Sequence, residues 1–256
     1  MEGILKTIVE RIEAEEGHLF RGFSRAAFKP EKRAAPIDVL AKARDQFLVI
    51  AEVKRGSPSR GIIRESSDPA ALARAYERGG ASAISVVTEK HFFFGDKDNL
   101  RRVKRAVRLP VLRKDFLTHE YQICESFNLG ADFILLIAAC LSEARLRNLC
   151  RTAEALGMRT LVEVHTRQEL RRALRVGPSL VGINNRDLRT FKTDWTASLR
   201  LRSLVPPGVP VISESGINSR AQIKALKAEG FSGALIGEHL LRQDDPGRAL
   251  EELLRG

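Results

Sequence analysis

The chain contains little cysteine, and its histidines form no metal-binding pattern. Its three cysteines, Cys124, Cys140 and Cys150, are odd in number and lack CxxC spacing, which favours reduced, buried thiols over disulfides. The five histidines are scattered and form neither an HxH nor an HExxH pattern. Because zinc sites in proteins are built from such clusters, we expect chemistry without a metal ion.

Long apolar runs are also missing. The longest, Phe133 to Leu141, has nine residues, whereas a membrane-spanning helix needs about 20. Several glutamates, beginning with Glu2 and Glu10, occupy the region where a secretory signal would need a basic and then an apolar segment. The sequence therefore predicts a cytoplasmic protein with no membrane partner.

Positive charge is in excess, with 43 Lys and Arg against 32 Asp and Glu and a net charge of +11. The two densest basic clusters, 101–105 and 171–175, lie on apparently amphipathic helices without interleaved aromatic residues. That pattern is typical of solvated outer helix faces and does not favour nucleic acid as a partner. A basic field does concentrate small phosphorylated or carboxylated substrates near a site.

Short β-like runs alternate with helical segments through most of the chain. Parallel strands need right-handed crossovers, and eight such units close most economically as a TIM (β/α)8 barrel. A doubly wound open sheet is the alternative, but the chain lacks the dinucleotide glycine fingerprint typical of that fold. We expect one domain, residues 1–256, with an N-terminal helical extension over 1–46 and eight βα units over 47–256. The expected strands are 47–53, 81–88, 109–113, 132–139, 160–164, 180–184, 209–213 and 233–237.

The extension precedes the repeats and carries an apolar stripe at helical spacing, including Ile4, Leu5, Ile8 and Ile12. This spacing predicts an amphipathic helix over residues 2–16 that packs on the barrel. We interpret it as a lid that buries one end of the barrel. Its acidic polar face disfavours binding to anionic lipid.

Polar residues end six of the apolar runs, where a strand buried on both faces should stay apolar. In a TIM barrel, the carboxyl ends of all strands point to one face and build the active site. An ion pair on the barrel rim could explain any one of these residues, but not so many at one level. Lysines and glutamates in a partly dry pocket shift one another's pKa values, so we predict a proton-transfer site. Its candidate residues are Glu52, Lys54, Lys114, Glu163, Asn184 and Glu214.

The last two strands end in Ser215-Gly216 and Gly237-Glu238, each followed by an expected helix start. Backbone N–H groups at such positions form the recurrent phosphate site of these barrels. The loop KRGSPSRG, which contains Ser57 and Pro58, could add contacts to the same group. The aromatic run 92–94 is costly if solvated, so it should either pack under the extension or line an aromatic pocket.

Taken together, the motifs AEVKRGSPS, LRKDF, VEVH, GINNRDL, SESGI and LIGE, in this order and spacing, resemble the indole-3-glycerol-phosphate synthase family. The resemblance implies a TIM-barrel carbon–carbon lyase, a carboxy-lyase of tryptophan biosynthesis. It implies closure of the indole ring of 1-(2-carboxyphenylamino)-1-deoxyribulose 5-phosphate, with loss of carbon dioxide and water. It also implies that no cofactor is used.

The same resemblance implies roles for the candidate residues. Lys114 polarises or protonates the ketone oxygen, and Lys54 pairs with the substrate carboxylate and can act as an acid in the dehydration. Glu163 is the base, while Glu52 is a further acid or base. Asn184 holds a substrate hydroxyl or a neighbouring carboxylate, and Glu214 orders the network. Which lysine acts at which step stays open.

Substrate-binding positions follow from the resemblance as well. The phosphate contacts are Ser57 and Pro58 in the loop with Ser215, Gly216, Gly237 and the backbone of Glu238. Apolar walls around the anthranilate ring are Phe93, Phe116, Leu135 and Leu188. Arg186 ties its loop. Two features depart from the family pattern, namely His239, where a small residue is common, and the charged loop 94–97.

Two other functions remain as alternatives. A phosphoribosyl isomerase of tryptophan or histidine biosynthesis works with a carboxylic acid and base pair and does not need both Lys54 and Lys114. A catalytically retired barrel could bind RNA or a protein through its basic helices, but the complete set of acids and lysines argues against it. We expect a monomer whose partner is a small phosphorylated molecule.

Overall fold

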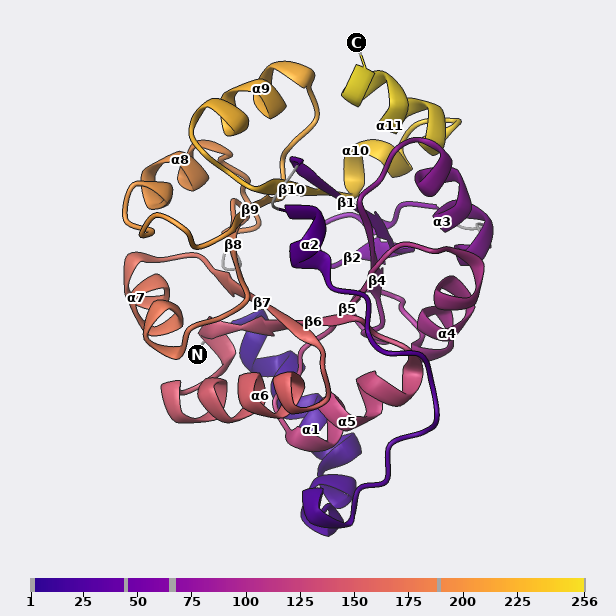
Figure 1. Cartoon of the computed structure of the whole chain (residues 1–256), viewed down its shortest axis with the longest axis vertical. Coiled ribbons are helices and arrows are strands. Elements are labelled where there is room, and N and C mark those ends of the chain that lie inside the picture. The colour runs from indigo at the N-terminus through magenta and orange to yellow at the C-terminus, as the bar shows by residue number, and fades with distance from the viewer. Residues whose placement is uncertain (1–2, 44–45, 65–67, 188–189, 256) are drawn as a thin grey trace.

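Eight parallel strands close into a barrel in the computed structural model, which describes residues 3–43, 46–64, 68–187 and 190–255. Figure 1 looks along the barrel, with the helices arranged around the ring of strands. Each strand pairs with the next along the chain, and β1 closes the ring by pairing with both β4 and β10. The TIM-barrel prediction is therefore confirmed. The barrel strands are β1 (Leu48–Val53), β4 (Ala83–Val87), β5 (Val111–Lys114), β6 (Phe133–Ile137), β7 (Arg159–Val164), β8 (Leu180–Asn184), β9 (Val211–Glu214) and β10 (Gly233–Ile236).

The helices that cover the barrel begin where local side chains cap them. Asp68 accepts hydrogen bonds from the first turn of α3, and Thr166 and Ser219 do the same for α7 and α9. The covering helices are α3 (Pro69–Arg78), α4 (Lys97–Ala106), α5 (Glu120–Leu129), α6 (Glu143–Ala155), α7 (Arg167–Val176), α8 (Thr196–Arg202), α9 (Arg220–Ala228) and α11 (Pro246–Arg255). Shorter elements are the ribbon β2 (Gly56–Ser57) and β3 (Gly61–Ile62), the helix α10 (Glu238–Leu241), and two 3-10 turns, η1 (Arg25–Ala27) and η2 (Ala138–Cys140).

Alternation along each strand divides the core into two layers. Successive side chains of a strand point to opposite faces, so in β1 Leu48 and Ile50 fill the barrel interior while Val49 and Ala51 pack toward the helices. The next inward position of β1 is Glu52. The same alternation that fills the barrel with apolar residues therefore places a charged one at its carboxyl end.

The N-terminal helix packs on the barrel as predicted, but it is longer than the sequence indicated. Helix α1 spans Ile4–Gly22, about a turn and a half beyond residue 16. Its last turn is held by aromatic contacts, since Phe20 stacks on His119 with ring centroids 4.6 Å apart. Its apolar stripe packs with side chains near the carboxyl ends of β5 and β6, where Leu5 and Ile8 share a buried cluster with Ile137.

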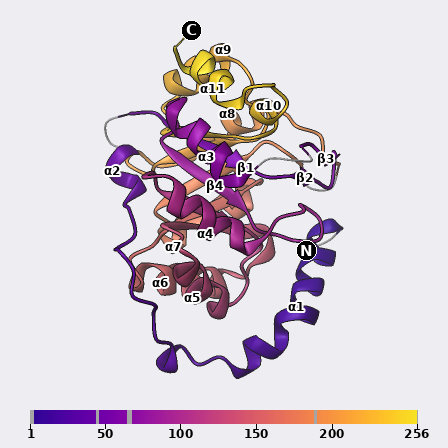
Figure 2. The ribbon, with the colours of Figure 1, turned by 90° about the vertical axis from the view of Figure 1, so that its right-hand side faces the viewer.

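A second short helix packs at the opposite end of the barrel. Helix α2 (Val39–Ala43) brings Val39, which is fully buried, into the interior cluster beside Leu48. Figure 2 shows α2 and α1 on opposite sides of the barrel, with the β2–β3 ribbon on the side of α1. Helix α1 therefore packs at the carboxyl end of the barrel, as a lid would, while α2 covers the opposite end, which the sequence did not predict. Sequence reasoning overlooked α2 because five residues are too short to show a helical period.

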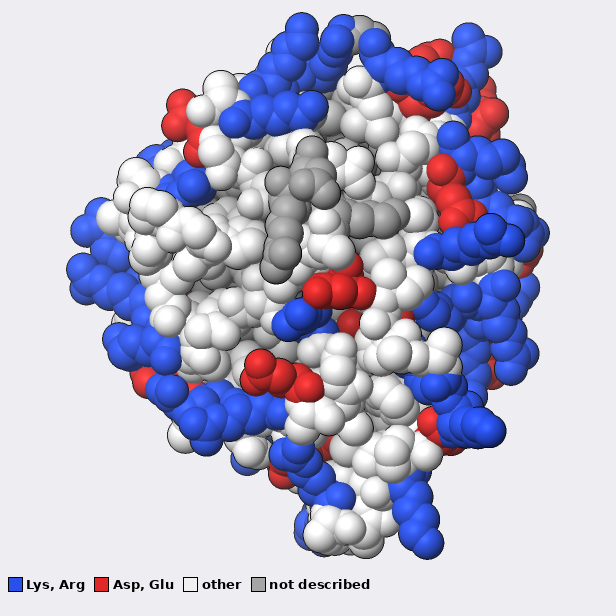
Figure 3. Space-filling model, viewed as in Figure 1, with Lys and Arg blue, Asp and Glu red and all other residues white. Residues whose placement is uncertain are grey.

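Basic side chains gather around the rim of the molecule. Figure 3 shows them over the outer helices, around a centre made largely of uncharged side chains. Several are neutralised locally: Arg102 lies 2.5 Å from Asp68, Lys104 lies 2.5 Å from Asp132, and Arg175 lies 2.6 Å from Glu143. These pairs show that these basic side chains of the outer helices have acidic partners on neighbouring elements. No helix within the described part of the chain is long and apolar enough to span a membrane.

Candidate active site

A cavity of about 410 Å³ opens at the carboxyl ends of the strands, a volume suited to a small-molecule ligand. Every predicted site residue within the described ranges lines it; Leu188 lies outside the described residues. The lining residues named by the sequence are Glu52, Lys54, Ser57, Pro58, Phe93, Lys114, Phe116, Leu135, Glu163, Asn184, Arg186, Glu214, Ser215, Gly216, Gly237 and Glu238. Closure of the barrel brings together side chains that are spread over most of the sequence.

Glu52 connects the two lysines. Lys54 donates a hydrogen bond to Glu52 Oε1, and Lys114 Nζ lies 3.7 Å from Glu52 Oε2. Burial by itself raises the pKa of Glu52, but the nearby positive charges of Lys54 and Lys114 outweigh it, so the pKa is lowered. Glu52 is therefore an anion at neutral pH.

Lys114 is held in its charged form. Burial alone would lower its pKa, but the negative charges of Glu52, Glu163 and Glu214 more than offset this effect and raise the pKa above the usual value. A protonated lysine that faces an apolar-walled cavity can donate a proton or a strong hydrogen bond to an oxygen on a bound molecule.

The surroundings of Glu214 favour its protonated form. Glu214 is 1% exposed, and none of the described residues donates a hydrogen bond to its carboxyl oxygens. Burial, and next the negative charge of Glu163, raise the pKa of Glu214 well above its usual range. In its protonated form Glu214 can donate toward Glu163, so the two carboxyl groups form an acid beside a base.

Two glycines make room for these buried carboxyl groups. A β-carbon on Gly182 of β8 would overlap Glu214 Oε1, and one on Gly237 would overlap Glu52 Oε1. Both positions lie beside the carboxyl ends of neighbouring strands, where a side chain would fill the space that the acid occupies. The glycine in GINNRDL and the one in LIGE thus have a packing reason.

His165 is a neighbour of Glu163 that sequence reasoning did not select, although it belongs to the VEVH motif. Its Nε2 atom lies 3.5 Å from Glu163 Oε1, and its Nδ1 atom lies 3.4 Å from Glu169 Oε2. Burial lowers the pKa of His165, but Glu169 and Glu163 offset this effect and raise it overall. Its position two residues beyond Glu163 could have identified it, because residues two apart in an extended segment lie on the same side.

The part of the cavity lined by Ser215, Gly216 and Gly237 has the backbone features of an anion site. Ser215 and Gly216 both have positive φ, 67° and 79°, and Gly237 precedes helix α10 directly. The side chain of Asn185, another residue not selected from the sequence, donates to the Ser215 carbonyl oxygen at 2.9 Å and holds this turn. Backbone N–H groups of such turns and helix starts bind phosphate groups.

Three arginines surround the carboxylate of Glu238. Arg186 lies 3.0 Å from Glu238 Oε2, while Arg60 and Arg242 lie 3.0 and 3.2 Å from Oε1. Arg186 also donates to Ser59 at 2.6 Å, which links the loop after β8 to the loop after β1. The local balance is net positive, which suits a dianion next to Ser215 and Gly237.

Aromatic and aliphatic side chains form the remaining wall. Phe93 and Phe116 lie with ring centroids 5.9 Å apart, and both line the cavity with Leu135. Phe92 and Phe93 also pack against the cluster that contains Leu5 and Ile8 of α1. Phe93 therefore meets both expectations for this aromatic run, since it faces the cavity and packs against the cluster that includes the N-terminal helix, whereas Phe92 meets only the second.

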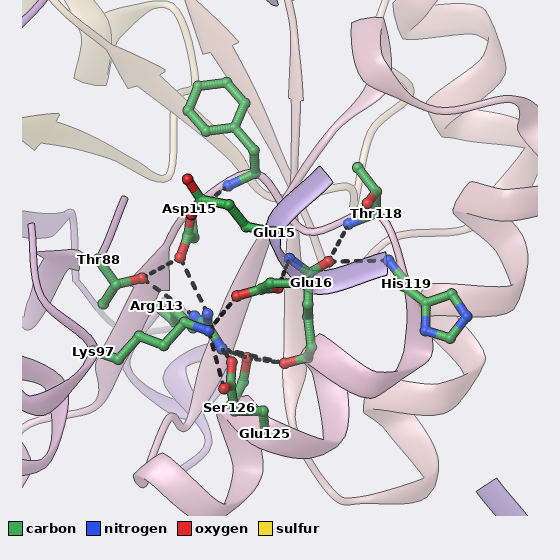
Figure 4. A network of polar contacts seen from close by, with 12 residues as sticks. Glu15, Glu16, Thr88, Lys97, Arg113, Asp115, Thr118, His119, Glu125 and Ser126 are labelled. Atoms are coloured by element: carbon green, nitrogen blue, oxygen red, sulfur yellow. Dashed lines mark hydrogen bonds and ion pairs between the residues drawn. The ribbon is translucent and has the colours of Figure 1, made fainter. Parts of the chain in front are cut away.

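A second polar network lies on the outer side of β5 and is shown in Figure 4. Arg113, next to Lys114 in the chain, is fully buried. Its guanidinium donates to Glu125 at 2.8 Å, to Ser126 at 3.1 Å and to Asp115 at 3.1 Å. Lys97 joins Glu125 to Glu16 of α1, at 3.0 and 2.5 Å. The network therefore ties the N-terminal helix to the strand that carries Lys114.

Fold and site together have the form of a TIM-barrel enzyme for a small anionic molecule, with acids and lysines gathered at the carboxyl ends of the strands. A family model described as indole-3-glycerol phosphate synthase matches residues 1–253. The indole-3-glycerol phosphate synthase of Sulfurimonas denitrificans is 48% identical over 226 residues, which cover 87% of this chain and 86% of that relative. The protein of the same name from Desulfotalea psychrophila is 46% identical over 259 residues and covers 100% of both chains.

The chain belongs to the indole-3-glycerol phosphate synthase family. This family carries out a decarboxylating carbon–carbon lyase step of tryptophan biosynthesis, as the motifs predicted. Among solved structures, 3-hexulose-6-phosphate synthase from Salmonella typhimurium has a TM-score of 0.65 at 13% identity and covers 81% of this chain and 98% of that chain. At this identity the likeness shows only the fold.

Proposed function

We propose that Lys114 is the acid that activates the ketone of 1-(2-carboxyphenylamino)-1-deoxyribulose 5-phosphate for ring closure. The ring carbon that bears the carboxylate attacks the ketone carbon, and the carbonyl oxygen takes up a proton. The position of Lys114, between Glu52 at 3.7 Å and the apolar wall, supports this role. Its raised pKa keeps a proton available at neutral pH.

Lys54 pairs with the substrate carboxylate in this proposal. After the new bond forms, that carboxylate leaves as carbon dioxide and its bonding electrons restore the aromatic ring. Lys54 then acts as the acid that protonates the departing hydroxyl. The hydrogen bond from Lys54 to Glu52 supports this assignment, because it keeps the ammonium group at the mouth of the carboxyl cluster.

Glu163 takes the ring proton during the loss of water, while Glu52 is a further acid or base. Glu214 orders this pair from behind, as its burial and neutral state favour. Asn184 holds a substrate hydroxyl. The Asn184 side-chain oxygen accepts from the Arg186 backbone at 3.0 Å, which orients the amide and supports this role.

The phosphate binds at the turn Ser215-Gly216 and at Gly237-Glu238, with Ser57 and Pro58 in the loop after β1. The anthranilate ring lies against Phe93, Phe116 and Leu135, with Leu188 as a further wall. The placement of the arginines around Glu238, opposite the apolar wall, supports this orientation.

One observation supports the proposal most directly, namely the meeting of Lys114, Glu52, Glu163 and Glu214 in a single cavity. The experiment measures the rise in indole fluorescence when the purified protein is mixed with the substrate. We expect Lys114→Ala and Glu163→Gln each to lower kcat by roughly 100-fold to 10,000-fold, the range typical of positioned acids and bases.

Matched controls are Lys90→Ala and Glu13→Gln, because both side chains are exposed. They should keep wild-type turnover. Circular dichroism separates loss of chemistry from loss of fold, since a cavity-facing polar residue is not core packing. Normal turnover in a folded Lys114→Ala variant would contradict the assignment of Lys114.

We propose further that residues 1–256 act as one domain and that the protein works as a cytoplasmic monomer. Packing of Val39 inside the barrel and of Leu5 on its rim supports a single domain. The three free cysteines support a reducing compartment. Ion pairing of Arg102, Lys104 and Arg175 argues against nucleic acid as a partner. Light scattering at several concentrations checks the oligomeric state.

A further inference from the structure

His165 lies directly behind the proposed base. It follows the last residue of β7, and its side chain sits between Glu163 of the strand and Glu169 in the first turn of α7. It is not among the residues that line the cavity. Neither ring nitrogen makes a hydrogen bond within the described structure, yet each lies within ion-pair distance of a carboxylate. An imidazole in this position acts on the substrate only through Glu163.

Glu169 is held firmly enough to orient the histidine. Its Oε2 atom accepts the backbone N–H of His165 at 2.7 Å, and its own backbone N–H donates to Thr166, the N-cap of α7, at 3.2 Å. A carboxylate in the first turn of a helix is also stabilised by the helix dipole. Glu169 is therefore a fixed anion on the far side of the ring.

We propose that His165, oriented by Glu169, is a positioning residue that keeps Glu163 ionised and aimed into the cavity. The proposal rests on the role of Glu163 given above. A protonated imidazole between two carboxylates satisfies both, and Glu163 then keeps one oxygen for the substrate. This is the arrangement in which a base is held by a third group behind it.

A protonated His165 would place a cation between two carboxylates. Its ring nitrogens lie 3.5 Å from Glu163 Oε1 and 3.4 Å from Glu169 Oε2, and Glu163 is 2% exposed. Without the imidazolium, both carboxylates lose this cationic neighbour. Burying a carboxylate without a partner is costly.

The groups that face His165 all favour its charged form except one. Glu163 from β7 and Glu169 from α7 raise its pKa, while Lys114 from β5 opposes them. Cys140 of η2 faces the same carboxylates, but burial, with help from Glu163 and Glu169, raises its pKa to about 12. The thiol therefore stays neutral over the working range and does not compete for the imidazolium.

The first experiment compares the pH profiles of kcat and KM for the wild type and His165→Gln. Because His165 does not touch the cavity, we expect KM to stay within about twofold and kcat at pH 7 to fall about tenfold, less than for loss of the base itself. The acidic limb of the profile should move to higher pH, since a carboxylate that loses a nearby cation holds its proton to higher pH. The control His18→Gln, at an exposed position, should change neither.

Glu169→Gln and the double variant test the route of the effect. If Glu169 acts through His165, the double variant should lose no more activity than His165→Gln alone. Losses that multiply, or an acidic limb that does not move in folded His165→Gln, would overturn the proposal. If His165→Gln does not fold, NMR titration of the imidazole decides the question. Its pKa should lie above the ordinary value in the wild type and fall in Glu169→Gln. An unshifted wild-type imidazole refutes the idea.

The outcomes also separate this inference from the proposed catalytic roles. If Glu163→Gln keeps full turnover, the assignment of the base is wrong. If Glu163→Gln is inactive while His165→Gln behaves as wild type at every pH, the base is right and the positioning role alone fails.

Discussion

The outer side of β5 and the inner side of the barrel hold two polar networks with opposite characters. Arg113 points outward and is fully buried, and it donates to Asp115, Glu125 and Ser126. Lys114, the next residue, points inward and faces the cavity, with Glu52 3.7 Å away. The outer network is closed on every side, whereas the inner one is open toward a ligand. The fully paired charge of Arg113 stabilises the fold, whereas the charge of Lys114 still faces the cavity and can interact with a ligand.

The largest expected effect is on stability and comes from the outer network. Arg113→Met should lower the free energy of unfolding by about 3–5 kcal/mol, because the buried carboxylate of Asp115 loses its cationic partner, while Glu125 keeps Lys97. Urea unfolding followed by circular dichroism measures this loss. The matched variant Lys114→Met should lose less stability than Arg113→Met, since Glu52 keeps Lys54 and the Lys114 side chain is partly exposed. Equal losses of stability in both variants would contradict the difference between the outer and inner networks.

An intermediate effect is expected from the glycine behind Glu214. In Gly182→Ala the new β-carbon overlaps Glu214 Oε1, so the carboxyl group must move and the acid–base pair with Glu163 is disturbed. We expect kcat to fall at least tenfold and stability to fall by about 1–3 kcal/mol, as for other overpacked sites. Gly22→Ala, where no atom lies within 4 Å of the added carbon, is the control. Unchanged kcat in Gly182→Ala would show that the position of Glu214 does not matter.

The smallest effect is a dependence of stability on pH. Because the pKa of Glu214 is raised in the folded state, the unfolded chain releases this proton first as pH rises. The free energy of unfolding therefore falls as pH rises from the ordinary pKa of 4.5 to the raised pKa. The fall is at most about 1.4 kcal/mol per pH unit. Glu214→Gln should remove this decline and gain stability relative to the wild type at pH 8. Parallel urea curves at pH 5 and pH 8 test it, and identical slopes in both proteins would contradict a neutral Glu214.

Strand positions and site residues were predictable because both follow from a period of two. Leu112 and Lys114 share the inward face of β5, as Leu161 and Glu163 do in β7. A polar residue at the end of an apolar run therefore marks both the end of a strand and the face of the site. His165 lies two residues beyond Glu163 and so follows the same period of two. It was overlooked because the expected strand ended at residue 164.

Other features had no such local signal. The outward Arg113 reads in the sequence only as a polar residue within an apolar strand, because its partner Glu125 lies in the following helix. Helix α2 is too short for a period, and α1 extends to Gly22 because of the contact of Phe20 with His119. Each of these depends on a neighbour distant in sequence.

By itself, the sequence determined the order of strands and helices, the face that each strand residue occupies and the chemical types of the groups at the barrel's carboxyl end. These properties follow from periodicity and from the energetic cost of burying polar groups. Only the tertiary structure decided that Glu52 lies between Lys54 and Lys114, that burial beside Glu163 raises the pKa of Glu214, and which helix closes the far end. Distances between strands and the loss of solvent around a charge arise when the barrel closes, and they set the pKa values on which the chemistry depends.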